Sequence, residues 1–475
     1  MKVVLVKPFN PHTYSFVPPI GLGYLASMLK IKGGHEVFLY EAVRDQLASI
    51  APFKIFLAEH KPDVVGIQVY SVDLHIVREY LRCVKGYNSR IVTVMGGPHP
   101  AADPLGTMDY FGEGLLDYCM AGEAEKSFLA LVNHLEGQGP SLKDVAGLVW
   151  RDPTRHRDTN LKEDESCCRI NAKEVVENLD ELPWPDWDLL SPKHYPPAPL
   201  GGVAKHFPVG PIMVSRGCPL KCTFCAAKSV YGNGFRVRNI DSVIEEIQYL
   251  RRSHGVKEIM ILDDNITFRK SLVLEFCEKM APLRIPWNCA NGIRADMVTE
   301  EIVKALKEAG CYLVAIGIES GSQRIVNDMQ KKIILERIRE KVDLLTQYGI
   351  HVVGLFMLGY PTETKEDVLK TIAFAKRLNI SAAAFANFLP LPGSPVYEAM
   401  KREGRLEDLD LGGMNYYQAR RSFTPHISVE ELNHLLKRAM REFHLRPRIL
   451  YRTLRRSGSL ANLFYLGKRL VERYV

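Results

Sequence analysis

Short apolar runs alternate with amphipathic stretches along residues 1 to about 135. The runs predict strands at Lys2–Val6, Glu36–Tyr40, Asp63–Val69, Arg90–Met95 and Tyr118–Ala121. Between them, Ile20–Ile31 and Val77–Val84 each carry one apolar face, as helices do. Strands that are apolar throughout and alternate with helices indicate a parallel sheet covered on both faces. We therefore expect a doubly wound α/β domain, whose ligand site lies at the carboxyl ends of the strands.

The same alternation returns at residues 211–390, where six strands are predicted: 212–215, 258–262, 287–291, 312–318, 351–358 and 382–388. Asp241 and Thr299 are suited to be N-caps of intervening helices. Six strand–helix units fit an open partial (β/α)6 barrel, because a closed barrel of this kind needs eight. The predicted fold class is α/β, with domain limits at 1–135 (doubly wound domain), 136–205 (connector), 206–395 (partial barrel) and 396–475 (helical region).

The connector is rich in charged residues and proline, and we expect only one small β element in it, near Gly147–Trp150. Its tryptophans, including Trp184 and Trp187, are expected to pin it to a neighbouring domain. The whole chain has a net charge of +7. Eleven Lys and Arg against two acids lie within residues 433–475, so the basic character belongs to the C-terminal region.

Three cysteines, Cys218, Cys222 and Cys225, follow the first barrel strand within eight residues. Three thiolates this close suit one metal centre, and they leave one iron of a [4Fe–4S] cluster without a protein ligand. Structural zinc is the alternative, but no fourth ligand stands at a short spacing, since the next cysteine is Cys277. Ten cysteines in 475 residues, with no secretory segment at the N-terminus, argue against disulfides and favour a cytoplasmic protein.

The spacing C-x3-C-x-F-C ahead of a run of β/α units resembles the radical S-adenosylmethionine (SAM) enzymes. The resemblance implies that SAM chelates the open iron and that an electron from the cluster cleaves it to a 5′-deoxyadenosyl radical. It also implies that Phe224 packs beside the adenine. An electron donor such as flavodoxin or ferredoxin is then expected as a partner.

SAM carries a sulfonium, an amine, a carboxylate and a ribose diol, so its site needs acidic and amide acceptors and one cation. The carboxyl ends of the barrel strands offer such groups. Asp263, Asp264 and Asn265 are expected to accept from the SAM amine, and Glu319 and Ser320 suit the ribose or the amine. Arg294 is expected to pair with the carboxylate, with an ion pair to Asp296 as the alternative.

The first domain is similar to cobalamin-binding modules, because a polar turn at Ser71 follows its third strand and Gly96-Gly97 follows its fourth. The order of domains then resembles the B12-binding radical SAM family, the group that includes anaerobic magnesium-protoporphyrin monomethyl ester cyclases and cobalamin-dependent methylases. The D-x-H-x-x-G signature of a lower cobalt ligand is absent after the first strand, where the chain reads Lys7 to His12. Cobalamin held without that ligand and a domain that binds no cobalamin both remain open.

We therefore expect an enzyme with a [4Fe–4S] cluster, SAM and cobalamin that functionalises, and in the favoured interpretation methylates, an unactivated carbon of an organic substrate. The alternatives are a cyclase or carbon–carbon bond-forming enzyme of the same architecture, and a non-catalytic metal-binding scaffold. The substrate is expected to be a small or lipid-like molecule. The basic tail, apolar from Leu460 onward on one face, suits either packing on the barrel or peripheral membrane contact. No nucleic-acid recognition module accompanies its charge.

Overall fold

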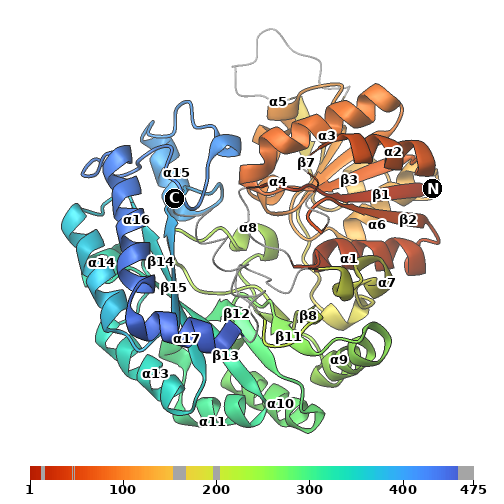
Figure 1. The fold of residues 1–475 in the computed structure, drawn as a ribbon. Coiled ribbons are helices and arrows are strands. Elements are labelled where there is room, and N and C mark those ends of the chain that lie inside the picture. Colours follow the sequence, from red (N-terminus) through yellow and green to blue (C-terminus); the bar gives the residue numbers. More distant parts are fainter. Residues whose placement is uncertain (12–16, 45–46, 48, 153–166, 196–203, 458–475) are drawn as a thin grey trace. The chain divides into compact units, whose positions relative to one another are not determined.

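A computed structural model describes residues 1–11, 17–44, 47, 49–152, 167–195 and 204–457 of the chain (Figure 1). The chain divides into two compact units. The first unit is formed by Met1–His194, Cys225–Arg236 and Leu391–Gly413, and the second by Tyr195–Phe224, Val237–Pro390 and Met414–Val475. Residues 391–413, which span the predicted limit between the barrel and the helical region, thus belong to the first unit.

The first unit is built on a seven-stranded sheet with the order β2-β1-β3-β4-β5-β6-β7. Its strands are β1 (Lys2–Lys7), β2 (Glu36–Glu41), β3 (Val64–Gln68), β4 (Val92–Gly96), β5 (Tyr118–Met120), β6 (Leu148–Arg151) and β7 (Cys168–Ile170). The five predicted strands are confirmed and run parallel. Two further strands, β6 and β7, are added antiparallel at one edge. The first sheet therefore continues into the stretch predicted as a connector.

Alternate residues of β1 point to opposite faces of this sheet, which is why the strand is apolar throughout. Val4 and Val6 belong to a core with α2 (Ala51–His60) and α3 (Leu74–Tyr87), whereas Val3 and Leu5 belong to a second core with α1 (Ile20–Ser27) and α6 (Glu125–Leu135). The doubly wound arrangement is confirmed. Shorter helices complete the unit: α4 (Pro98–Ala102), α5 (Pro104–Phe111), α7 (Trp187–Leu190), α8 (Lys228–Tyr231) and α15 (Pro395–Arg402).

The second unit contains an open six-stranded sheet with the order β15-β14-β13-β12-β11-β8. Its strands, all parallel, are β8 (Val209–Ile212), β11 (Glu258–Ile261), β12 (Trp287–Ile293), β13 (Cys311–Glu319), β14 (His351–Leu358) and β15 (Ala382–Asn387). The predicted partial barrel is confirmed. Residues 212–215 were expected to form one strand, but the first barrel strand ends at Ile212 and a short β9 (Ser215–Arg216) follows.

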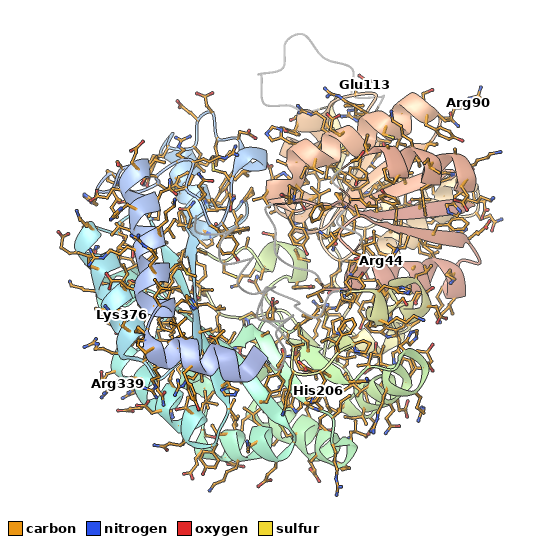
Figure 2. All side chains as sticks on the ribbon, viewed as in Figure 1. Arg44, Arg90, Glu113, His206, Arg339 and Lys376 are labelled. Atoms are coloured by element: carbon orange, nitrogen blue, oxygen red, sulfur yellow. The ribbon has the colours of Figure 1, made fainter. Side chains whose placement is uncertain are left out.

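The helices between the strands of the second unit lie on the outer side of its curved sheet (Figure 1). Exposed charged side chains such as Arg339 and Lys376 project outward from them (Figure 2). The helices of the second unit are α9 (Ile240–His254), α10 (Lys270–Met280), α11 (Glu300–Glu308), α12 (Gln323–Asp328), α13 (Leu335–Gln347), α14 (Lys365–Arg377), α16 (Val429–His444) and α17 (Pro447–Ser457). This layer buries the outer face of the strands and leaves their carboxyl ends for the site.

The start of α9 corrects one prediction from the sequence. The N-cap is Asn239, whose Oδ1 accepts from the amides of Asp241 at 2.8 Å and Ser242 at 3.4 Å. Asp241 lies in the first turn, where the positive end of the helix dipole stabilises its negative charge. Thr299 is confirmed as an N-cap, since its hydroxyl accepts from the Ile302 amide.

Among the described residues, no helix has the length and apolar character needed to cross a bilayer. Helix α17 is amphipathic and basic, and Arg448 and Arg452 both donate to Asn379 Oδ1 just beyond α14. The predicted apolar face from Leu460 onward lies outside the described residues. Two of the basic side chains of α17 thus bind the chain that follows α14.

Candidate active site

The cysteine segment, residues 218–225, begins just after β9, which follows the first barrel strand. Gly217 turns the chain there with a φ of 87°, a conformation that favours glycine. All three predicted ligands, Cys218, Cys222 and Cys225, have partly exposed thiols. Within the described ranges, no group of three or more His, Cys, Asp or Glu side chains already stands at metal-binding geometry. Because the three cysteines are partly exposed, they can serve as ligands of the kind that an iron–sulfur cluster uses.

A cation lies beside two of these cysteines. Arg294, which follows β12, places Nη1 4.0 Å from Cys222 Sγ and makes a two-point ion pair with Asp296, at 2.9 and 2.8 Å. Burial raises the pKa of the Cys218 thiol, and the charge of Arg294 offsets part of that effect. The alternative predicted for Arg294, pairing with Asp296, is thus present, and its contact with the SAM carboxylate stays a prediction.

In the turn Asp263–Asn265 after β11, two residues are buried and one is exposed. Asp263 accepts from the Val214 amide at 2.7 Å and from the Ser215 hydroxyl, so it fixes the chain that leads to the cysteines. Burial raises the pKa of Asp263 to about 7. Asn265 is also buried, and its Oδ1 accepts from Thr267. Asp264 is the one residue of the three with an exposed surface, although burial of its carboxyl raises its pKa and the Gly217 amide donates to it. It is therefore the member of the trio with a surface that a ligand can reach.

At the end of β13, Glu319 has a φ of 68°, a strained backbone conformation for a residue with a side chain. Its carboxylate pairs with Lys331 at 2.7 Å, and both side chains are largely buried. Lys331 Nζ also lies 5.5 Å from the centre of the Phe224 ring, within the cysteine segment. Lys331 therefore links Glu319, the predicted ribose contact, to Phe224, the predicted neighbour of the adenine. The sequence did not predict this lysine.

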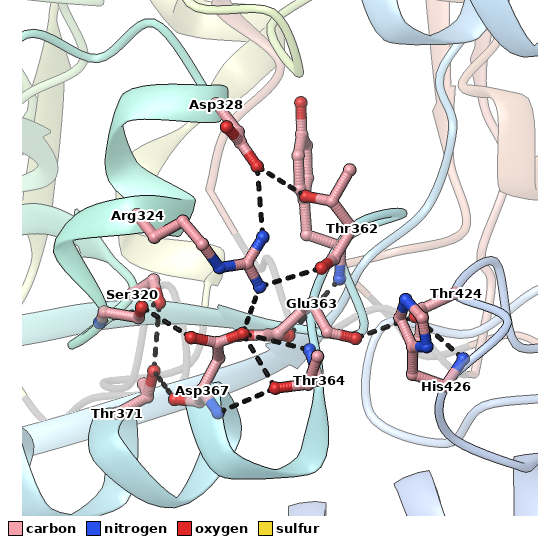
Figure 3. A network of polar contacts seen from close by, with 12 residues as sticks. Ser320, Arg324, Asp328, Thr362, Glu363, Thr364, Asp367, Thr371, Thr424 and His426 are labelled. Atoms are coloured by element: carbon pink, nitrogen blue, oxygen red, sulfur yellow. Dashed lines mark hydrogen bonds and ion pairs between the residues drawn. The ribbon is translucent and has the colours of Figure 1, made fainter.

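Ser320 points away from that cluster. Its side chain is fully buried and shares a 3.0 Å hydrogen bond with Thr371 on α14. It belongs to a polar network beneath the strand ends, in which Arg324 and Ser322 bind Asp367 (Figure 3). Burial acts to raise the pKa of Asp367, but these hydrogen bonds lower it to about 2. The structure thus gives Ser320 a packing partner, and its predicted contact with SAM is untested.

In the first unit, the predicted cobalamin residues lie at the carboxyl ends of the neighbouring strands β3 and β4. Ser71 is buried and lies 2.9 Å from His99 Nδ1, and burial lowers the pKa of His99. Gly97 has a φ of 103°, and a Cβ there would lie 3.1 Å from the Val69 carbonyl oxygen. A Cβ on Gly96 would meet the Met120 Cβ at 3.9 Å, an ordinary van der Waals contact. The backbone conformation therefore requires glycine at position 97, whereas position 96 would accept a small side chain.

The first unit also contains a buried ion pair, between Arg236 and Glu123, that the sequence did not predict. The two terminal nitrogens of Arg236, Nη1 and Nη2, donate to Glu123 at 2.7 and 3.1 Å, and the Val176 amide donates to the same carboxylate. Both side chains are almost fully buried. The pair joins residues more than a hundred positions apart, so no local pattern could have indicated it.

Comparison with known proteins settles the family. The profile of the radical SAM superfamily matches residues 212–375, and that of the B12 binding domain matches residues 8–132. An uncharacterized methyltransferase, PH0819, of Pyrococcus horikoshii is 32% identical over 96% of this chain and 95% of its own length. This chain belongs to the B12-binding radical SAM enzymes. The enzyme is also 28% identical to the cytidylyl-2-hydroxyethylphosphonate methyltransferase of Streptomyces wedmorensis, over 94% of this chain and 90% of the relative.

Solved structures agree with the fold of the enzyme. The radical SAM methyltransferase TsrM of Kitasatospora setae, with cobalamin and a [4Fe-4S] cluster bound, has a TM-score of 0.68 at 17% identity, over 85% of this chain and 78% of that one. The cobalamin-dependent radical enzyme OxsB has a TM-score of 0.64, over 94% and 62%. The predicted cofactors, a [4Fe–4S] cluster, SAM and cobalamin, follow from the family. The partly exposed cysteines near Arg294 and the glycine pair at the end of β4 are compatible with them.

Proposed function

We propose that this enzyme transfers a methyl group, carried by cobalamin, to an unactivated carbon of a small organic substrate in the cytoplasm. The observation that carries the proposal is the full-length similarity to methyltransferases, together with the partly exposed cysteines that follow the first barrel strand and the cobalamin-like strand ends of β3 and β4. When bound, the cluster supplies the electron that cleaves SAM, and cobalamin supplies the methyl group.

The chain's own residues have distinct parts in this proposal. Cys218, Cys222 and Cys225 hold the cluster. Asp264, the exposed acid of its turn, accepts from the SAM amine, while the buried Asp263 fixes the start of the cysteine segment. These assignments rest on which polar atoms are already engaged within the protein and which face solvent.

The groups around the nucleoside are proposed in the same way. Phe224 packs beside the adenine, and Glu319, held by Lys331, faces the ribose. Arg294 stabilises thiolate charge near Cys222, and it meets the SAM carboxylate only if it releases Asp296.

For cobalamin, Ser71, Gly96 and Gly97 form the proposed contact edge. Ser71 and His99 are linked by a hydrogen bond, so a ligand at Ser71 would also meet the histidine. Gly96 lets the cofactor approach the backbone, and Gly97 shapes the turn that exposes it. The electron donor is proposed to be a flavodoxin or ferredoxin, and peripheral membrane contact is proposed for the basic C-terminal region. Co-sedimentation with anionic vesicles tests that contact.

The decisive assay needs no substrate. Anaerobically reconstituted enzyme is given SAM, a reductant and cobalamin, and two products are measured. The proposal expects 5′-deoxyadenosine, which requires the cluster, and S-adenosylhomocysteine, which requires methyl transfer to cobalamin. Cys218→Ala should remove the first product, whereas Cys277→Ala, a buried cysteine outside the segment, should not. Deoxyadenosine without S-adenosylhomocysteine would instead favour a cyclase-like activity, such as that of the related magnesium-protoporphyrin ester cyclases.

A further inference from the structure

Thr223 lies between Cys222 and Phe224, and other elements hold it at both its backbone and its hydroxyl. Its amide donates to the Met329 carbonyl at 3.0 Å, just beyond α12. Its hydroxyl lies 2.8 Å from the hydroxyl of Tyr360, which follows β14, and makes a longer bond, 3.4 Å, to the carbonyl of Asp328 in α12. The cysteine segment is thus bonded to residues more than a hundred positions later in the chain.

Tyr360 is well placed to act as a fixed support. Its side chain is only 4% exposed and meets the Phe388 ring edge-on, with centres 5.4 Å apart. Burial raises the pKa of its phenol further above its ordinary value, and the protonated hydroxyl is hydrogen-bonded to Thr223. A tyrosine with two side-chain torsions, packed on this ring, gives up little further freedom when it holds the segment.

The backbone of Tyr360 is in turn held by Glu363, which is fully buried (Figure 3). Glu363 Oε2 accepts from the amides of Gly359 at 2.6 Å and Tyr360 at 3.3 Å, and its own amide donates to the Tyr360 carbonyl. Its carbonyl accepts from the Thr424 hydroxyl at 2.7 Å. One buried carboxylate therefore closes the turn that presents Tyr360.

We propose that Tyr360 is a positioning residue that sets the cysteine segment through Thr223, with Glu363 holding Tyr360 in place. The inference rests on the proposed function, because it assumes that Cys222 binds the cluster and that Phe224 faces SAM. The Thr223–Tyr360 bond lies between those two positions. Its loss should therefore alter how firmly the cluster is held and how SAM meets it, with little effect on the rest of the second unit.

The test compares Tyr360→Phe and Thr223→Val with the double variant. Iron release to a chelator from reconstituted protein should be about fivefold faster in Tyr360→Phe, equivalent to ~1 kcal/mol for one lost hydrogen bond. Thr223→Val should release iron at least as fast, because it also removes the 3.4 Å bond from the Thr223 hydroxyl to the Asp328 carbonyl. The double variant should be no faster than Thr223→Val, which has already lost the bond to Tyr360. The EPR spectrum of the reduced cluster with SAM should also shift or broaden in all three.

Tyr312→Phe is the matched control, since its hydroxyl bonds Glu258 at 2.6 Å, where β11 begins, rather than the cysteine segment. It should leave iron release and the EPR spectrum unchanged, and its effects should add to those of Thr223→Val. If wild-type protein holds a cluster and Tyr360→Phe matches it in both readouts, the positioning role is overturned. If wild-type protein holds no cluster at all, the proposed function falls and the positioning role falls with it.

Discussion

Glu363→Gln offers a quantitative test of the buried network, because it removes an ionisable group and retains the hydrogen bonds. The glutamine oxygen can still accept from the Gly359 and Tyr360 amides. Glu363 Oε1 is buried and finds no hydrogen-bond partner among the described residues. Burial raises the pKa of this carboxyl from 4.5 to about 8.

The sign of the pH dependence follows from proton binding. An unfolded chain loses the Glu363 proton near pH 4.5, whereas the folded protein keeps it until about pH 8. Between these values the folded state binds one more proton, so wild-type stability falls by about 1.4 kcal/mol per pH unit, and by about 5 kcal/mol at most. Glu363→Gln carries no such proton. Its unfolding free energy relative to wild type should therefore rise by roughly 2 to 3 kcal/mol between pH 6 and pH 8.

Urea unfolding of both proteins at several pH values measures this difference. Glu340→Gln, an exposed glutamate on α13, is the control and should track wild type at every pH. A constant gap between Glu363→Gln and wild type from pH 6 to pH 9 would refute the reasoning. It would mean that the carboxyl is ionised in the folded protein and stabilised by groups other than the two amides.

Three further predictions concern single positions. Arg236→Met should lower the unfolding free energy by about 3 to 5 kcal/mol, since it leaves Glu123 buried without its cation, as urea titration would show. Gly97→Ala should cost about 1 to 3 kcal/mol through its positive φ and its approach to the Val69 carbonyl, and should weaken cobalamin binding measured by absorbance titration. Lys331→Met should weaken SAM binding in equilibrium dialysis by roughly tenfold or more, because Glu319 at the end of β13 loses the cation that pairs with it.

The sequence predicted the two sheets well because their strands are buried on both faces. Strands such as Lys2–Lys7 and Cys311–Glu319 are almost uninterrupted apolar runs, and short runs of this kind between helices are typical of a covered parallel sheet. It did not predict β7, Cys168–Ile170, which has only three residues and two exposed side chains. Such an edge strand gains its structure from pairing with β6, and nothing in its own composition indicates this.

The candidate site was predicted in its residue types but not in its internal pairing. Cysteine spacing and the rule that ligands meet strand ends located Cys218, Asp264 and Glu319. Whether a polar side chain is free to bind a ligand depends on which other side chains already bond it. For Glu319 that partner is Lys331, twelve positions later in the chain. The Arg294–Asp296 pair was anticipated, because its partners are only two positions apart.

The most direct test of the account is the iron and cobalt content of protein produced anaerobically with cobalamin, followed by the visible spectrum. A chain that holds one [4Fe–4S] cluster and one cobalamin should contain about four irons and one cobalt. Alanine at Cys218, Cys222 or Cys225 should remove the iron and leave the cobalt in place. Iron that stays bound in these variants, or a wild-type chain that retains neither metal, would contradict it.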